Sequence, residues 1–429
     1  MSQPTAVRRR AVNPWWVGFV AGMASFLDGA AVTGNAFALV IYQHTIGLTP
    51  TEIGVLTSVL TFGVAIGALV GGRLGDRFGR RRVFIATMVL VVAGGLLPML
   101  ATSFWPILAG LSVLGLAVGA DIPVSLATIA EAASDTNRGK ILVLSNLLWG
   151  IGIGATVLVT SLTAATGRFG AQAIYGLVVV VGLVVLLLRL TIPESTSWIT
   201  ARDERRRGVL SVRAQTVHLR DLLQRPLRFP FLVLAGFFTL VSVPIQVFGS
   251  YVAYIGANYG GVPVATFSVV ILLGLPLAVI AQVFFMRIID TRFRLTFFLA
   301  GGVLFVVGYL VPVLFGINLT TLVAAVFLAG LGTVFCGEPI FRVWANEAFP
   351  TMLRGTAQGF LFGLARIVPA VLLAPVPALI AASPTVFFIT LSVLAAAGVA
   401  IGWGGFHGNR VVNEFDHEDE PVDAELAAA

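Results

Sequence analysis

One charged stretch, Gly71 to Arg82, constrains the fold of this chain more than any other feature. It contains five arginines and one aspartate, and it separates two long apolar runs. Because so many charges cannot lie in hydrocarbon, both runs must end at the same aqueous face. The stretch therefore predicts two antiparallel membrane-spanning segments joined by a short charged turn with glycines at its bends.

The rest of the chain has the composition of a protein whose main solvent is lipid. Hydrophobic residues make up 58% of the 429 residues, charged residues make up 11%, and the mean hydropathy is +0.97. A spanning helix needs about 20 apolar residues. The sequence predicts an all-α membrane protein with twelve transmembrane helices near 15–43, 52–72, 83–102, 105–131, 141–164, 171–190, 230–256, 264–288, 294–315, 320–347, 355–381 and 385–404.

Positive charge alternates from one loop to the next along the chain. Apart from Arg168, no Lys or Arg occurs in the loops near 43–51, 102–106, 257–263, 316–319 and 382–384, whereas the other loops are rich in Arg. This is the positive-inside distribution, and it predicts that both termini are cytoplasmic. The net charge of +7 therefore reports topology, and we expect no nucleic-acid partner.

The predicted spans fall into two groups of six. We expect an N-terminal half over 1–191, a cytoplasmic linker with amphipathic helices over 192–229 and a C-terminal half over 230–404. An acidic tail over 405–429 is predicted to be disordered. The two halves form a pseudo-symmetric pair in this interpretation.

An internal repeat supports the division into halves. Glu131 is followed after six residues by Arg138, and Glu347 is followed after six residues by Arg354. The charged stretch around Asp76 is repeated in part at 290–294. Such repeats place a substrate site near the bilayer midplane, between the halves, with access alternating by rocking.

The charged members of the repeat sit at the predicted cytoplasmic ends of the spans. One interpretation is an ion network between helices that closes an inner gate and breaks when the gate opens. The other is topogenesis alone, since any inner loop needs cations. The gate interpretation is favoured for Asp76, Arg77, Arg80, Glu131, Arg138, Glu347 and Arg354.

Several charged residues fall inside predicted spans, where each costs about 2.5–3.5 kcal/mol on insertion scales. Asp28, Asp121 and Glu338 are candidates for proton coupling, because a carboxylate whose arginine partner or water access changes can load and release a proton. Glu338 and Arg342 lie four residues apart and are positioned to pair. Asp28 has no cation in its own span and is the favoured coupling site, although a fixed structural network is the alternative for all of them.

Glycines spaced four residues apart predict helices that approach closely, since lipid supplies no hydrophobic drive between them. The pairs are Gly18/Gly22, Gly63/Gly67/Gly71, Gly115/Gly119, Gly150/Gly154 and Gly359/Gly363.

These motifs resemble those of major facilitator superfamily transporters, and within them those of the sugar porter family. The stretch from Gly71 to Arg82 resembles the loop between the second and third helices, and the run Phe26-Leu27-Asp28-Gly29 resembles the first-helix aspartate motif. The run Pro193-Glu194-Ser195 resembles the motif that ends helix 6, and 347–355 resembles E-x-F-P-x3-R-G. The resemblance implies the twelve-helix fold with two halves, alternating access and a proton-coupling role for Asp28.

The resemblance also implies substrate contacts for some residues and departs from the family at others. Asn146 and Gln246 fall where sugar-contacting glutamines are expected in helices 5 and 7. Leu111 stands where sugar porters usually have an arginine. Arg342 takes the position of a sugar-stacking tryptophan, with Trp344 two residues further on. The expected site is therefore more charged than a hexose site.

Two substrate classes fit these residues. A polyhydroxy ligand favours amides, carboxylates and an aromatic face, whereas an acid favours arginine, here Arg342 and Arg366. We expect proton-coupled uptake of a sugar or an inositol-like polyol. The alternative is symport of a small organic acid or another anion, and drug:proton antiport and nutrient sensing are less favoured.

The sequence contains no phosphate loop, no metal-spaced His/Cys set and no nucleophile elbow. We therefore expect neither an enzyme nor an ATP-driven pump, and no cofactor or metal. The expected partners are a small-molecule substrate, protons and the lipid bilayer. The protein is expected to act as a monomer in the cell membrane.

Overall fold

The computed structural model describes residues 13–132, 138–194, 199, 221–223, 227–289, 291–349 and 351–407. The predicted amphipathic linker and acidic tail lie almost wholly outside these residues. Side chains with predicted roles that also lie outside the described part are Asp76, Glu131, Arg138, Asn146 and Arg354.

The first half of the chain forms six long helices and one short 3-10 turn. They are α1 (Pro14–Ile46), α2 (Pro50–Phe78), α3 (Arg80–Leu100), α4 (Phe104–Ala132), α5 (Arg138–Thr163), η1 (Ala164–Thr166) and α6 (Arg168–Arg189).

The second half begins after the short turn η3 (Asp221–Leu223). Its helices are α8 (Arg228–Tyr259), α9 (Val264–Ile288), α10 (Arg294–Phe315), α11 (Leu319–Cys336), α12 (Glu338–Ala348), α13 (Thr351–Leu373), α14 (Val376–Ala382) and α15 (Pro384–Phe406).

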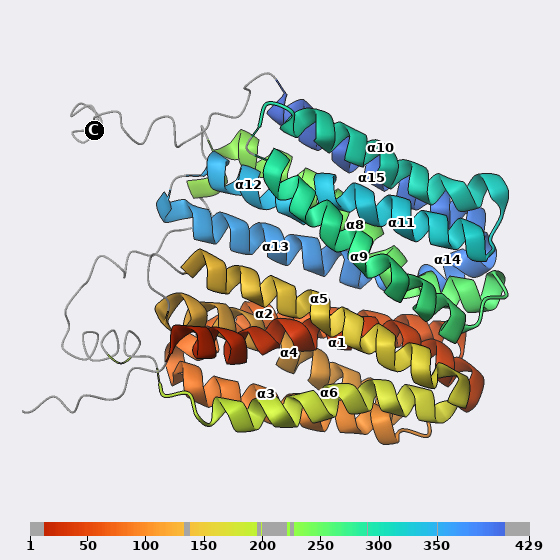
Figure 1. Ribbon diagram of the computed structural model, residues 1–429, viewed down its shortest axis with the longest axis horizontal. Helices are drawn as coiled ribbons and strands as arrows, with labels where there is room; N and C mark the ends of the chain where they lie inside the picture. Colours follow the sequence, from red (N-terminus) through yellow and green to blue (C-terminus); the bar gives the residue numbers. More distant parts are fainter. Residues whose placement is uncertain are drawn as a thin grey trace, which may run out of the picture.

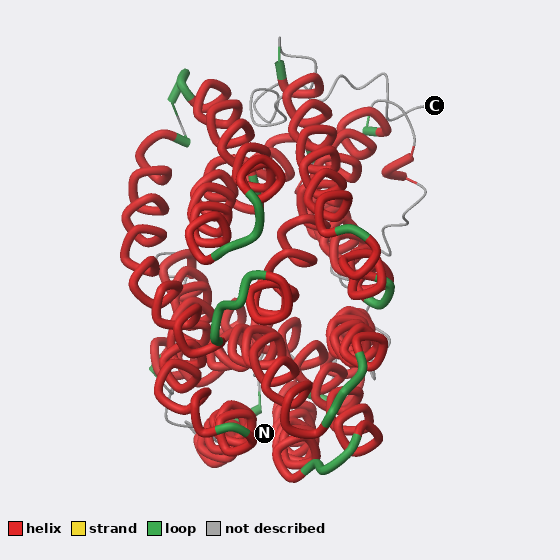
Figure 2. Tube along the Cα trace, turned by 90° about the vertical axis from the view of Figure 1, so that its right-hand side faces the viewer, coloured by secondary structure: helices red, strands yellow, loops and turns green. Residues whose placement is uncertain are grey.

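These helices confirm the predicted all-α membrane fold. In the part of the chain that the structure describes, eleven helical segments are long and apolar enough to span a membrane. The bent pair α13 and α14 supplies the twelfth span, with an angle of 51° at its break. Figure 1 shows the helices lying nearly parallel, with α1–α6 (red to yellow) forming one bundle and α8–α15 (green to blue) the other. Figure 2 shows the same two bundles end-on.

The charged stretch from Gly71 to Arg82 is mostly helical. Helix α2 continues to Phe78, and α3 begins at Arg80, so the turn between them is the single residue Gly79. Its φ of 97° lies in the left-handed region that favours glycine. The first bundle therefore turns sharply at this face, which we call the proximal end because α1 begins and α15 ends there.

Glycines let α2 and α4 pack backbone against backbone. A Cβ added to Gly67 would lie 2.3 Å from the carbonyl oxygen of Leu116, and one added to Gly119 would lie 2.1 Å from that of Val64. The glycine prediction is confirmed for these helices. It is wrong for Gly150 and Gly359, which would meet nothing within 4 Å.

Two spans of the second bundle are interrupted, one between α11 and α12 and the other between α13 and α14. Helix α11 ends at Cys336, and α12 begins after Gly337. Pro339 lies in the first turn of α12, where proline is tolerated because backbone N–H groups there form no hydrogen bond within the helix. Helix α13 ends before Pro375, and α14 follows. The first break places Glu338 at the N-terminus of a helix inside a predicted span, where the helix dipole favours a negative charge.

Candidate functional site

The two bundles meet along three helix pairs: α2 with α13, α5 with α9, and α1 with α8. At the distal end, opposite the proximal end, the amides of Gln43 and Asn258 exchange hydrogen bonds of 2.9 and 3.0 Å between α1 and α8. Ser58 Oγ donates to the carbonyl oxygen of Ala370 at 2.6 Å between α2 and α13. These bonds tie the halves together at the distal end.

Asp28 lies deeper in the interface, about 21 Å from the start of α1 at 1.5 Å per residue. Its side chain is 5% exposed, and its Oδ2 lies 3.6 Å from Nη2 of Arg366 on α13. The indole N–H of Trp149 on α5 donates to the same oxygen at 3.2 Å. Asp28 has no cation in its own helix, and the cation beside it comes from the other half of the molecule.

A row of side chains continues from Arg366 into the second half. Phe362 lies one helical turn before Arg366 on the same face of α13. The guanidinium carbon of Arg342 lies 5.6 Å from the centre of the Phe362 ring. Arg342 in turn donates to Glu338 Oε1 at 2.5 and 2.9 Å, as their spacing predicted.

We call this row the interface site. It crosses from one half to the other and consists of Trp149, Asp28, Arg366, Phe362, Arg342 and Glu338. Its two carboxylates and two guanidiniums balance to zero formal charge. Three of these four charged side chains are between 38% and 48% exposed, and only Asp28 is buried.

Gln246 belongs beside this site. Its side-chain nitrogen donates at 2.9 Å to the carbonyl oxygen of Ala365, the residue before Arg366. The bond fixes α8 against α13 and leaves the amide oxygen of Gln246 as an acceptor. Asn146, the other predicted amide, is on α5 one turn before Trp149, but its side chain lies outside the described part.

Trp344 is placed elsewhere. It is fully buried in an aromatic cluster, stacked on Phe406 of α15 with 4.1 Å between ring centres and packed against Phe237 and Phe298. Counting along the sequence gave its position but not its face of α12. Because none of its surface is exposed in this conformation, we leave Trp344 out of the interface site.

Asp121 also lies away from the interface site, in a buried polar cluster of the first half. Both of its oxygens are bonded by the guanidinium of Arg189 at the end of α6, one of them at 2.6 Å. Thr87 donates to it at 2.8 Å, and the guanidinium also bonds Ser125 at 3.2 Å and lies over the ring of Phe84 at 4.2 Å. Asp121 and Arg189 are 1% and 0% exposed, so this cluster has no opening for a proton or substrate.

Sequence reasoning missed Arg189, Trp149 and Phe362. Arg189 ends an apolar run and reads as one more cation of the inner face, so nothing in the sequence marks it as buried. Phe362 could have been found, since it stands four residues before Arg366 on a helix. Trp149 could have been found only by knowing which face of α5 meets α1.

The predicted gate residues have described contacts within their own halves. Arg294 donates to Glu347 at 2.6 Å, which joins α10 to α12 at the proximal end. In the first half, a carboxylate oxygen of Glu194 accepts from the backbone N–H of Arg80 at 2.8 Å, at the start of α3. Arg77 lies over the ring of Phe78 at 5.3 Å. The Arg294–Glu347 pair and the Glu194 contact thus each join two segments at the proximal end of one bundle.

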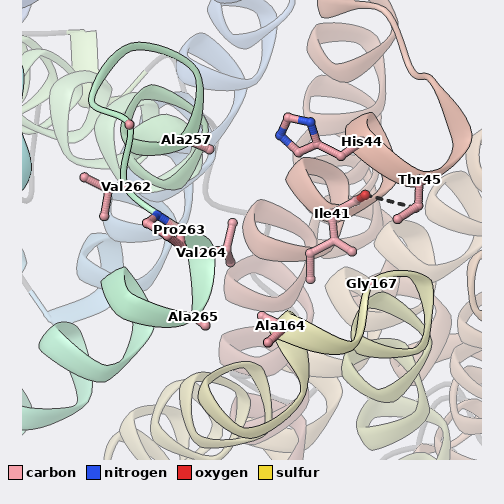
Figure 3. Close-up of a pocket in the computed structure, with 12 residues that line it drawn as sticks. Ile41, His44, Thr45, Ala164, Gly167, Ala257, Val262, Pro263, Val264 and Ala265 are labelled. Carbon is pink, nitrogen blue, oxygen red and sulfur yellow. Dashed lines mark hydrogen bonds between the residues drawn. The ribbon is translucent and has the colours of Figure 1, made fainter.

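A separate hollow of about 420 Å³ opens at the distal end (Figure 3). It lies between the halves and is lined by the ends of α1 and α8, by η1 and by the start of α9. His44 is its only ionisable lining residue, and no member of the interface site lines it. In the part of the chain that the structure describes, no group of three or more His, Cys, Asp or Glu is placed to hold a metal ion.

Two bundles of membrane-spanning helices with a buried carboxylate between them fit a membrane transporter. Residues 18–373 match the family described as the Major Facilitator Superfamily, to which the chain therefore belongs. The protein is a multi-pass membrane transporter of this family, as the sequence motifs indicated.

Similar proteins include several transporters. The minor myo-inositol transporter IolF of Bacillus subtilis is 29% identical over 356 residues, which cover 81% of this chain and 80% of IolF. The metabolite transport protein YaaU of Escherichia coli, whose assignment is itself provisional, is 26% identical over 80% of each chain. The inward-open xylose transporter XylE of E. coli has a TM-score of 0.73 at 16% identity, covering 92% of this chain and 98% of XylE. This last likeness shows the fold alone.

Proposed function

We propose that the protein takes up a neutral polyol or sugar, of the inositol type, together with protons by alternating access between its two halves. The observation that carries the proposal is the interface site, in which a single buried carboxylate lies among exposed, charge-balanced groups between the halves. The likeness to a myo-inositol transporter supports the substrate class. The likeness to a structure of a D-xylose-proton symporter supports the fold that such transport uses.

Charge balance favours a neutral substrate over an acid. An anion bound to Arg342 or Arg366 would compete with Glu338 or Asp28, which already bind these guanidiniums. A polyol can instead donate to the carboxylates and accept from the guanidiniums without displacing either charge. Phe362 and Trp149 add the apolar faces that sugar and polyol rings pack against.

Asp28 is the proposed proton carrier. It is buried, it faces the partner half, and its contact with Arg366 depends on the relative position of the halves. Asp121 is bonded by Arg189 within one bundle, so rocking would not change its partners. Glu338 pairs with Arg342 on its own helix and is assigned to substrate binding.

The remaining roles follow from topology. The positive-inside pattern supports a cytoplasmic location for the proximal end and both termini. In this orientation the distal bonds of Gln43 with Asn258 tie the two halves together at the outer end. The pair Arg294 and Glu347 would brace the cytoplasmic end of the second half, as one described part of the predicted gate. A monomer in the cell membrane is sufficient for this cycle.

Uptake into proteoliposomes tests the proposal. The panel is myo-inositol, hexoses, pentoses and small carboxylates, each with and without an inward proton gradient. We expect gradient-stimulated accumulation of a neutral polyol or sugar. The Asp28→Asn variant should lose accumulation but retain substrate exchange, because exchange needs no proton release.

Two controls make this test specific. Glu52→Gln removes a half-buried carboxylate that caps the distal start of α2, a role that glutamine can also fill, and should leave accumulation unchanged. Glu338→Gln should weaken substrate affinity while preserving the response to the gradient. Accumulation of acids alone, or full accumulation by Asp28→Asn, would refute the proposed substrate or the proposed proton carrier respectively.

A further inference from the structure

We propose that Arg366 of the second half is the counter-charge of Asp28 in the first, and that this pair makes proton binding and substrate binding cooperative. When a proton neutralises Asp28, the guanidinium is released to bind substrate oxygens. The inference rests on the proposed function and names the residue that couples its two ligands.

The contact has the geometry of a pair that can exchange partners. Nη2 of Arg366 lies 3.6 Å from Oδ2 of Asp28, which is longer than the 2.7–3.2 Å of ordinary N–H···O bonds. The same oxygen already accepts the indole N–H of Trp149. Arg366 is 38% exposed, so its guanidinium is accessible as well as close to the buried carboxylate. The attraction is electrostatic and is not locked by a bidentate bond.

No other described cation competes for Asp28. Helices α2, α4, α5, α6, α8 and α9 pack against α1. Within their spans they contribute Asp121, and the Arg189 side chain from the end of α6 binds it. On α4 the candidate position for a cation holds Leu111, which is fully buried in the apolar core. The other described charges on these helices and on α1 lie at or near helix ends: His44, Glu52, Arg73, Arg77, Arg168, Arg228 and Arg287.

Tyrosines are the other titratable groups that face α1. Tyr175 donates to Asn35 and Tyr42 donates to the carbonyl oxygen of Pro98, both toward the distal end. Across the interface, Glu338 and Arg342 bind each other. Arg366 is therefore the described cation that lies beside Asp28.

Cooperativity follows from what each partner needs. Protonation of Asp28 leaves Arg366 without its carboxylate inside the span, and polyol hydroxyls can accept the hydrogen bonds that the guanidinium then offers. Each ligand therefore favours the other, and by linkage the effect is reciprocal. Coupling of this kind typically changes affinity by about 5- to 150-fold. Because the two residues belong to different halves, releasing the pair also removes an attraction that opposes their separation.

The first test needs no substrate. Trp149 touches Asp28, so its fluorescence in the purified full-length protein, taken as the difference from Trp149→Phe, should titrate with pH. Arg366→Gln should move the midpoint upward by about one pH unit or more, because a nearby cation stabilises the ionised carboxylate. Arg366→Lys keeps the charge and should move it less. Arg342→Gln, a matched arginine paired on its own helix, should leave the midpoint in place.

The second test uses myo-inositol binding between pH 6 and pH 8. In the wild type, affinity should rise at least fivefold as the pH falls, and in Arg366→Gln this dependence should vanish. An Arg366→Gln protein with the wild-type midpoint and the wild-type pH dependence overturns the inference while leaving the proposed function intact.

The two failures are distinguishable. A wild-type protein that binds no polyol or sugar refutes the proposed function, and the fluorescence midpoint still decides whether Arg366 is the counter-charge. The double variant Asp28→Asn/Arg366→Gln adds a check on the pair. If the residues act together, its loss of myo-inositol affinity at pH 6 should be smaller than the sum of the single losses.

Discussion

Removing Arg189 should destabilise the first half strongly, although the residue lies outside the interface site. The variant Arg189→Met keeps the length of the side chain but removes two charge-assisted hydrogen bonds to Asp121. Each such bond contributes about 1.5–3 kcal/mol, which gives a loss of about 3–6 kcal/mol. Removing one partner of a buried ion pair typically costs about 3–5 kcal/mol of stability, which agrees with this range. Thr87 alone would then bond the buried carboxylate, so we expect a loss of about 4 kcal/mol.

Two companion variants separate charge from packing. Asp121→Leu/Arg189→Met replaces the pair with apolar groups and should recover at least half of the loss, since no charge is left buried without a partner. Arg342→Met breaks the half-exposed pair with Glu338 and should cost no more than about 1 kcal/mol. The two variants thus compare the loss of an arginine–carboxylate pair in a buried site with the same loss in a half-exposed site.

The assay is reversible unfolding in mixed micelles of dodecylmaltoside and SDS, followed by circular dichroism. A loss of less than about 1 kcal/mol for Arg189→Met would refute the reasoning, because the cluster would then tolerate an uncompensated carboxylate. A double variant no more stable than the single one would show that lost packing, not charge, is responsible.

Other regions give further predictions. Gly71→Ala should destabilise the fold by about 1–3 kcal/mol, because its Cβ would lie 2.2 Å from the carbonyl oxygen of Ala120. Gly72→Ala, whose Cβ would meet nothing closer than 3.9 Å, is the matched control and should not destabilise it in the same unfolding assay. Asn258→Ala removes the bonds to Gln43, and spin labels at 47 and 260 should then report a longer distance component. An unchanged distance distribution would show that these amides do not hold the distal end.

The sequence predicted what depends on local pattern. Apolar run length located the spans, and the i,i+4 spacing of Glu338 and Arg342 predicted their bond. Glycine spacing identified the close approach of α2 and α4 around Gly67. In each case the determining contacts are within one helix or follow from its periodicity.

Contacts between helices could not be predicted in the same way. The bond of Asp121 with Arg189 and the contact of Asp28 with Arg366 join residues 68 and 338 positions apart, and no spacing rule selects those partners. Trp344 shows the related difficulty, since its position was close to the expected one but its side chain faces the core. Which face of a helix meets which neighbour is decided by packing of the whole bundle.

Whether substrate and protons move together is the central claim, and the most direct measurement is substrate-driven proton movement. Proteoliposomes are loaded with a pH-sensitive dye at equal internal and external pH, and myo-inositol is added outside. The account predicts that the interior acidifies with the wild-type protein and not with Asp28→Asn. Uptake of myo-inositol by the wild type without acidification would contradict proton symport.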